Sequence, residues 1–491
     1  MVVVDASKRL KDVVDEEVCD QDGSMFSKWT YKDYFVFWIK SIHTYCGTEK
    51  ESGPDPEVII VATHWDRNVY QNNKDCLITS LQYQFPTNST LGAKYIRDDK
   101  IFMTQFSQES PIEILSDLEK HIIDIACQDR WADNIPKEWT FMEIEIPQKK
   151  SSQRIESIDE ISNKMPMEFQ KAVTDMLRYY HDAGKILHFN ETDLQELIII
   201  DVQWFVDAFK NIITDKLHQK GIEASMDDWD EYYQTGHLKD SLLTEIWRKK
   251  DQDLHQELLV KGRAAIEDET SEDPRYLLPH KDEILMFMNR LGLVAAGDES
   301  HYVPCMNREE VDRELTSTIC GSNEKSFVLL FQFDFLPYFL FYRLVVSCMQ
   351  MGTWEVLRSK GKPCLYRNVA LFSTKDNHFA IAVTETAIQL QVYHPVLDEI
   401  LEVEKTLNIQ RIIEGKMNEI TSSFRRGMKF IGGFICKNGN DLSNTLNIEG
   451  HFISELTLKK KEKVVCPLHQ GTDLHVINTN EMTKYWEVQS K

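Results

Sequence analysis

The first 150 residues alternate short apolar runs with segments of helical periodicity. The apolar runs Val2–Val4, Val58–Ala62 and Ile101–Met103 predict β-strands. Apolar side chains at helical spacing after about Thr30 predict a helix: Tyr34, Phe37, Trp38, Ile42 and Tyr45. Ser110-Pro111-Ile112-Glu113 has the form of a capping box and predicts the start of a second helix. Strands that alternate with helices predict a parallel sheet covered on both faces.

The pattern changes after residue 150. Residues 146–166 are polar and bounded by prolines, which predicts a domain linker. Residues 167–318 are mostly helical in pattern, and a helix at Ile284–Leu291 precedes two short strands near Leu293 and Tyr302, which predicts a winged helix. Residues 319–491 read as mixed α+β structure, with a hairpin predicted at 379–392 and a helix at about 403–420.

Composition narrows the class of protein. A chain of 491 residues predicts two to four domains. A net charge of −23 argues against a nucleic-acid binder, because neutralisation of phosphates dominates that affinity. Ten cysteines without a C-x-x-C spacing indicate reduced thiols and a cytoplasmic location. The longest apolar run, Phe327–Val346, contains Asp334, Pro337 and Arg343, so we predict a strand followed by a helix and no transmembrane span.

One motif suggests recognition of a nucleotide base. The predicted strand Val58–Ala62 leads into Thr63-His64-Trp65-Asp66, and a buried strand that ends in T-x-x-D resembles the guanine-reading strand of a Ras-like GTPase. That resemblance implies that Thr63 and Asp66 contact the base. Phosphate binding needs G-x-x-x-x-G-K-[ST], and no Gly-Lys pair in the chain has the required upstream glycine. The GTPase fold therefore reads as partial.

The order of motifs along the whole chain resembles the Roco proteins. The strand with Thr63 and Asp66, Trp38 on the preceding helix, and Ile135-Pro136 with Trp139 resemble the C-terminal half of a Roc GTPase domain. The segments 181–189 and 201–207 resemble the paired motifs of a COR domain. The resemblance implies a partial Ras-like α/β domain at 1–150, a winged-helix COR-A-like domain at 151–318 and a mixed α+β COR-B-like domain at 319–491.

The resemblance also implies a function. We expect an intracellular signalling scaffold that self-associates through its COR-B-like region and binds other signalling proteins, with a degenerate GTPase half that does not hydrolyse GTP. No cofactor is expected, because GTP or GDP and Mg²⁺ would need the missing N-terminal half. One alternative is a truncated form of an active GTP-binding Roco GTPase. A further alternative is a winged-helix protein that binds nucleic acid.

Two weaker patterns complete the candidate sites. Cys466, His469 and His475 have a spacing compatible with zinc, but a structural zinc site needs four ligands, so no metal site is predicted. Asp20-Gln21-Asp22-Gly23 spells the D-x-x-G switch motif in an acidic loop, where we interpret it as chance. Chance pairs of histidine and acidic residues are expected in this composition, so no catalytic residue is predicted.

Overall fold

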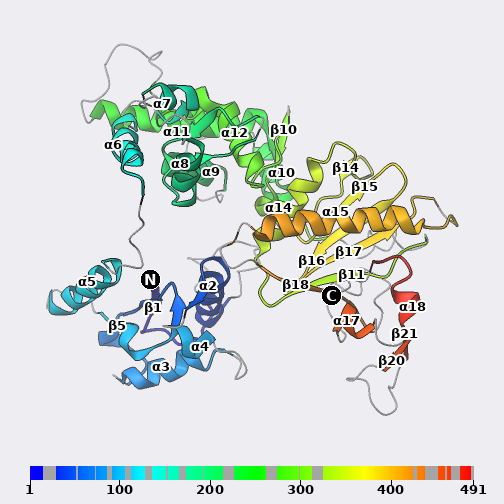
Figure 1. The fold of residues 1–491 in the computed structure, drawn as a ribbon, viewed down its shortest axis with the longest axis horizontal. Helices are drawn as coiled ribbons and strands as arrows, with labels where there is room; N and C mark the ends of the chain where they lie inside the picture. Colours follow the sequence, from blue (N-terminus) through cyan, green and yellow to red (C-terminus); the bar gives the residue numbers. More distant parts are fainter. Residues whose placement is uncertain are drawn as a thin grey trace. The chain divides into compact units, whose positions relative to one another are not determined.

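The computed structural model describes most of the chain in separate stretches (Figure 1). The described residues are 1–14, 29–50, 53–71, 73–85, 91–104, 112–127, 135–150, 153–164, 173–191, 193–213, 226–260, 273, 275–297, 299–311, 324–396, 398–422, 424, 428–436, 452–458, 462–465 and 476–487. The D-x-x-G segment and the trio of Cys466, His469 and His475 lie outside them. The chain forms two compact units: residues 1–133, 313–341 and 376–491, and residues 134–312 and 342–375.

The N-terminal part of the first unit is a small parallel α/β fold. Its strands are β1 (Val2–Asp5), β4 (Ile60–Thr63) and β5 (Ile101–Met103), all parallel in the order β1-β4-β5, and β2 (Thr48–Lys50) pairs with β3 (Gly53–Asp55). Its helices are α2 (Tyr31–Tyr45), α3 (Lys74–Gln82), α4 (Leu91–Tyr95) and α5 (Ile112–Ala126). The predicted strands, helices and parallel sheet are confirmed. The Ser110-Pro111 part of the predicted capping box lies outside the described residues.

Helix α2 shows why this segment folds as the pattern predicts. Thr30 caps it, because its hydroxyl oxygen accepts from the Asp33 amide and the Asp33 carboxylate accepts from the Thr30 amide at 2.9 Å. Its apolar face buries Phe35 and Ile39 against β1 and β4 residues in one continuous core. Burial of this stripe fixes the helix on the sheet.

The second unit begins with helices and a small antiparallel sheet. Its first elements are α6 (Thr140–Lys149), β6 (Ile155–Ser157), α7 (Ile158–Lys164), α8 (Val173–Asp182), β7 (Leu187–His188), β8 (Leu197–Ile199) and α9 (Val202–Ile212). The sheet order is β6-β8-β7. The linker predicted at 146–166 is wrong over its described residues, because they form the end of α6, then β6 and α7. The polar residues suggest an exposed linker, but Arg154 and Glu156 are buried in the folded unit, where Glu156 pairs with Lys149.

The remaining helices of this unit surround a larger core. They are α10 (Met226–Thr235), α11 (Asp240–Val260) and α12 (Lys281–Arg290), with strand β9 (His237–Lys239) antiparallel to β10 (Ser300–Tyr302). The helix predicted at 284–291 is confirmed, and the predicted strand near Tyr302 is β10. The strand expected near Leu293 is replaced by a single bridge between Ala295 and Tyr302, so the partner of β10 comes from β9.

A mixed α/β region with a large antiparallel sheet follows. Its strands are β11 (Leu329–Phe333), β12 (Glu355–Val356), β13 (Arg358–Ser359), β14 (Lys362–Pro363), β15 (Val369–Ser373), β16 (His378–Val383), β17 (Ala387–Tyr393), β18 (Phe430–Ile435), β19 (Phe452–Ser454), β20 (Lys463–Val465) and β21 (Val476–Asn478). Its helices are α14 (Tyr338–Met349), α15 (Val403–Ser422), α17 (Glu455–Leu458) and α18 (Thr479–Met482). Seven strands form the sheet in the order β12-β15-β16-β17-β11-β18-β19.

The sequence patterns in this region are confirmed. The predicted hairpin is β16 paired antiparallel with β17, and the predicted helix is α15. The long apolar run is strand β11 followed by helix α14, as expected. Among the described residues, no helix has the length and apolar character needed to cross a membrane.

Candidate functional site

The carboxyl ends of three parallel strands bring the predicted base-reading residues to one edge of the sheet. Because β1, β4 and β5 are parallel, Asp5, Thr63 and Thr104 all lie at this edge. The backbone ties the edge together: the Thr104 amide donates to the Ala62 carbonyl at 2.8 Å, and the Trp65 amide donates to the Thr104 carbonyl at 3.1 Å. The turn that carries the motif is therefore anchored to both β4 and β5.

Thr63 and His64 point their polar atoms toward β1. The Thr63 hydroxyl donates to the Val4 carbonyl at 3.4 Å. His64 adopts the left-handed backbone conformation (φ 53°), and its Nδ1 lies 3.3 Å from Asp5 Oδ1. A histidine tolerates this conformation better than a β-branched residue does. Thr63 thus supports the turn through its contact with β1.

Asp66 lies on the short 3-10 turn Trp65–Arg67 that follows β4. Its side chain is 41% exposed, and its described ionic partner is the neighbouring Arg67, 3.5 Å away. An exposed ion pair of this kind contributes little, so the carboxylate keeps acceptor positions for other donors. Trp38, on α2, has 54% of its surface exposed.

The carboxylate of Asp66 suits the hydrogen-bond donors of a nucleotide base and not its phosphates. Asp66 could accept the two N–H donors of a guanine edge, because an ionised carboxylate accepts several hydrogen bonds. The full sequence supplies no P-loop for the phosphates. The donor set therefore does not fit a complete Mg²⁺-nucleotide.

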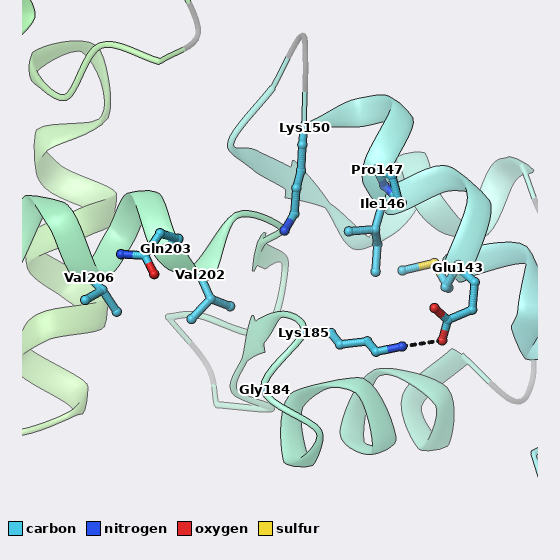
Figure 2. Close-up of a pocket in the computed structure, with 10 residues that line it drawn as sticks. Glu143, Ile146, Pro147, Lys150, Gly184, Lys185, Val202, Gln203 and Val206 are labelled. Atoms are coloured by element: carbon cyan, nitrogen blue, oxygen red, sulfur yellow. Dashed lines mark hydrogen bonds and ion pairs between the residues drawn. The ribbon is translucent and has the colours of Figure 1, made fainter. Parts of the chain in front are cut away.

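A second candidate site, absent from the sequence predictions, is a pocket of about 470 Å³ in the second unit (Figure 2). Its apolar lining comes from α6 and α9: Met142, Ile146, Pro147, Val202 and Val206. Its polar lining consists of Glu143, Lys150, Lys185 and Gln203. Glu143 and Lys185 form an ion pair at 2.6 Å, so α6 is tied to the turn that follows α8. No local sequence signal joins these residues, which lie 42 positions apart.

The two COR-like motifs of the sequence meet at this pocket. From segment 181–189, Gly184 ends α8 in the left-handed conformation (φ +69°) and places Lys185 at the pocket. From segment 201–207, Asp201 caps α9 by accepting the Trp204 amide at 3.3 Å, and Gln203 and Val206 line the wall. The motifs therefore have a structural reason to occur as a pair.

Two other residues of these motifs, Trp204 and His181, make hydrogen bonds that stabilise the fold around the pocket. The Trp204 indole donates to the Arg275 carbonyl at 2.9 Å, and His181 Nδ1 accepts the His188 amide at 3.3 Å. Burial lowers the pKa of His181, because the charged imidazolium loses solvation there. Such a histidine stays neutral near pH 7 and acts here as a hydrogen-bond acceptor.

The pocket lies beside a cluster of basic side chains. The carboxylate of Asp201 faces Arg154 Nε at 3.4 Å and Lys150 Nζ at 4.0 Å. Burial lowers the pKa of Arg154, and the nearby Asp201 opposes that shift. Arg154 is the closer cation, so Asp201 is only partly available to Lys150. Among the described residues, no group of three or more histidines, cysteines and carboxylates could hold a metal ion.

Comparison with known proteins identifies this part of the chain. Residues 136–280 match the family model described as "C-terminal of Roc, COR-A domain", which includes both motifs and the pocket. The comparison with curated proteins found no match. Among solved structures, that of Methanosarcina barkeri Roco2 RocCORdC bound to GDP is similar at 16% identity, covering 55% of this chain and 68% of that chain. Its TM-score of 0.32 is too low to support an argument about fold. The comparisons therefore show that residues 136–280 are similar to a COR-A domain, the domain that the two sequence motifs indicate.

Proposed function

We propose that this protein is a Roco-type signalling scaffold that self-associates through residues 319–491. The proposed organisation has a partial Roc domain at 1–150, a winged-helix COR-A domain at 151–318 and a COR-B domain at 319–491. The partial Roc domain would bind guanine nucleotide weakly and would not hydrolyse it. The helices α9, α11 and α12 together with the β9–β10 ribbon support the winged-helix assignment.

The observation that carries the proposal is a set of exposed apolar side chains in the COR-B-like region. Val396 and Ile400 precede α15 and Val403 is its first residue, and these side chains are 50%, 71% and 44% exposed. Ile431 on β18 and Leu456 on α17 are 54% and 51% exposed. Exposed apolar side chains favour a protein–protein contact, and a two-fold contact would pair each of them with the same surface of a second copy.

Sedimentation velocity of the full chain at tens of micromolar tests self-association. Wild-type protein should sediment as a dimer, and Ile400→Asp should shift it toward monomer, because a buried charge would face its own copy across a two-fold contact. Ile144→Asp is the matched control, since Ile144 is 60% exposed on α6, outside the proposed region. A monomeric wild-type chain, or equal effects of the two substitutions, would contradict the proposal.

Nucleotide binding by the partial Roc domain is the second candidate, favoured by the exposed carboxylate of Asp66. It would act through the base alone, so its affinity should be low. A third reading, nucleic-acid recognition through α9, has less support. That helix packs Trp204, Phe205, Ala208 and Ile212 into the core, and its only basic residue is Lys210. A recognition helix needs more cations than this to contact phosphates.

A further inference from the structure

We propose that the COR-A pocket binds a small amphipathic monocarboxylate, a molecule with one carboxylate and an apolar body of about ten carbons. A volume of about 470 Å³ falls within the range of small-molecule sites. The proposal is independent of both self-association and guanine binding, so it can fail while either of those stands. It rests on the composition of the walls and on the arrangement of the charges.

The apolar walls suit a hydrocarbon body. Met142 and Ile146 are buried on α6. Figure 2 shows Val202, on α9, across the pocket from Ile146. Val206 extends the apolar wall and is 45% exposed. Burial of a hydrocarbon chain against these side chains would remove apolar surface of both partners from water, which stabilises the complex. Methionine at such a wall also adapts to ligands of different shape.

The charges select an anion. The pocket is lined by two lysines and one glutamate. Lys185 is already paired with Glu143 at 2.6 Å, which leaves Lys150 as the less committed cation. Its carboxylate neighbour Asp201 is 4.0 Å away and is shared with Arg154 and the α9 cap. Figure 2 shows Lys150 pointing from the end of α6 into the space between Ile146 and Val202. A ligand carboxylate placed there would accept a charge-assisted hydrogen bond from Lys150.

The polar groups also argue against other ligand classes. A dianionic phosphate would want several donors, and here Lys185 is neutralised by Glu143. A cationic ligand would meet Lys150 and Lys185 against a single carboxylate in the lining. A neutral hydrocarbon would leave Lys150 unused. A monocarboxylate matches both the net positive charge of the lining and its apolar area.

The test uses decanoate as the probe on the full-length protein labelled at methionine methyl groups with ¹³C. Decanoate should shift the methyl resonance of Met142, which lines the pocket, with a Kd of roughly 0.1–1 mM. The methyl resonance of Met288, buried in a different cluster of the same unit, should not move. Decanol, the neutral probe of equal chain length, should bind several-fold more weakly.

Two pairs of variants separate recognition from folding. Lys150→Gln should weaken decanoate binding about fivefold and leave decanol unchanged, because one partly exposed ionic contact is lost. Lys249→Gln is its control, since Lys249 has similar exposure but is paired with Asp253 on α11. Val206→Asp should weaken decanoate binding about tenfold by placing a second anion at the wall, while Ile213→Asp, at the end of the same helix, should not.

Each outcome supports or overturns the proposal. A shift of Met142 that is weakened by both pocket variants supports it. If Met142 does not move at millimolar decanoate, the pocket does not bind this class of ligand. If decanol binds as tightly as decanoate, or if Lys150→Gln leaves decanoate binding unchanged, recognition of the carboxylate is refuted. Self-association and GTP titrations are unaffected by any of these results.

Discussion

Two glycines that end helices in the same way offer a matched test of the packing in the second unit. Gly184 follows α8 and Gly292 follows α12, with φ of +69° and +68°. At each end, the glycine amide donates to the carbonyl three residues back, and the next amide donates to the carbonyl five residues back. After α8, Gly184 donates to His181 and Lys185 to Tyr180. After α12, Gly292 donates to Asn289 and Leu293 to Met288. This is the Schellman arrangement, which favours glycine because of its positive φ.

Alanine at the two positions should have different costs. A Cβ at Gly184 would meet no atom within 4 Å, so only the left-handed backbone is penalised, by about 1 kcal/mol. A Cβ at Gly292 would lie 2.9 Å from Arg343 Cγ and 3.2 Å from Arg343 Cα. Because the second of these is backbone, relief requires movement of the chain, and overpacking of this kind adds about 1–3 kcal/mol. Gly292→Ala should therefore cost about 2–4 kcal/mol.

Hydrogen exchange measured by mass spectrometry suits a chain with more than one folding unit, because a single melting temperature is not well defined there. In peptides from α12, Gly292→Ala should speed exchange about 30- to 1000-fold. In peptides from α8, Gly184→Ala should speed it about fivefold. Gly352→Ala, where a Cβ also meets nothing within 4 Å and φ is not in the left-handed region, is the neutral control. Equal effects of the two substitutions would show that a clash with Arg343 does not add to the cost at Gly292.

Three further predictions concern the site and the stability of each part. Titration with a fluorescent GTP analogue should not saturate below micromolar concentrations, because the sequence has no P-loop to bind the phosphates beside the base contacts of Thr63 and Asp66. Saturation at nanomolar concentrations would contradict this prediction. Burial raises the pKa of Asp240, but hydrogen bonds from Lys281 and His301 outweigh it, so the net pKa is lowered. Asp240→Asn should speed amide exchange in α11 peptides relative to wild type at pH 7, with the ratio shrinking below about pH 4; a constant ratio would contradict the linkage. Amides of β1 should exchange faster than those of α9, because β1 pairs with β4 alone among the described strands; equal protection would indicate a self-sufficient sheet.

Local pattern is sufficient where a short segment has a clear apolar or alternating pattern. The apolar run at 101–103 predicts a strand and the alternation at 379–392 predicts a hairpin, both close to the observed bounds. The paired segments 181–189 and 201–207 indicate a COR domain, and both lie within the residues that match the COR-A model. The sequence by itself thus determined the order of elements and indicated the COR-A region.

The local sequence pattern does not predict the structure of segments whose polar residues are buried. Residues 146–166 have the composition of a linker, yet Arg154 and Glu156 are 8% and 3% exposed and have ionic partners in the folded unit. A polar side chain is buried only when a partner satisfies it, and that partner is set by the fold. Composition records the polarity of a residue and not its partner, so the linker prediction was wrong.

The COR-A pocket was likewise decided by tertiary structure alone. Glu143 and Lys185 lie 42 residues apart in sequence and 2.6 Å apart in the fold, and Lys150 reaches the same space from the end of α6. Each of these residues is an ordinary surface side chain in a helix or turn when read locally. The sequence determined which motifs are present, because helix ends and caps are local. Only packing of α6 against α8, with α9 lining the same pocket, placed the charges around one cavity, because that packing depends on burial of apolar faces distant in sequence.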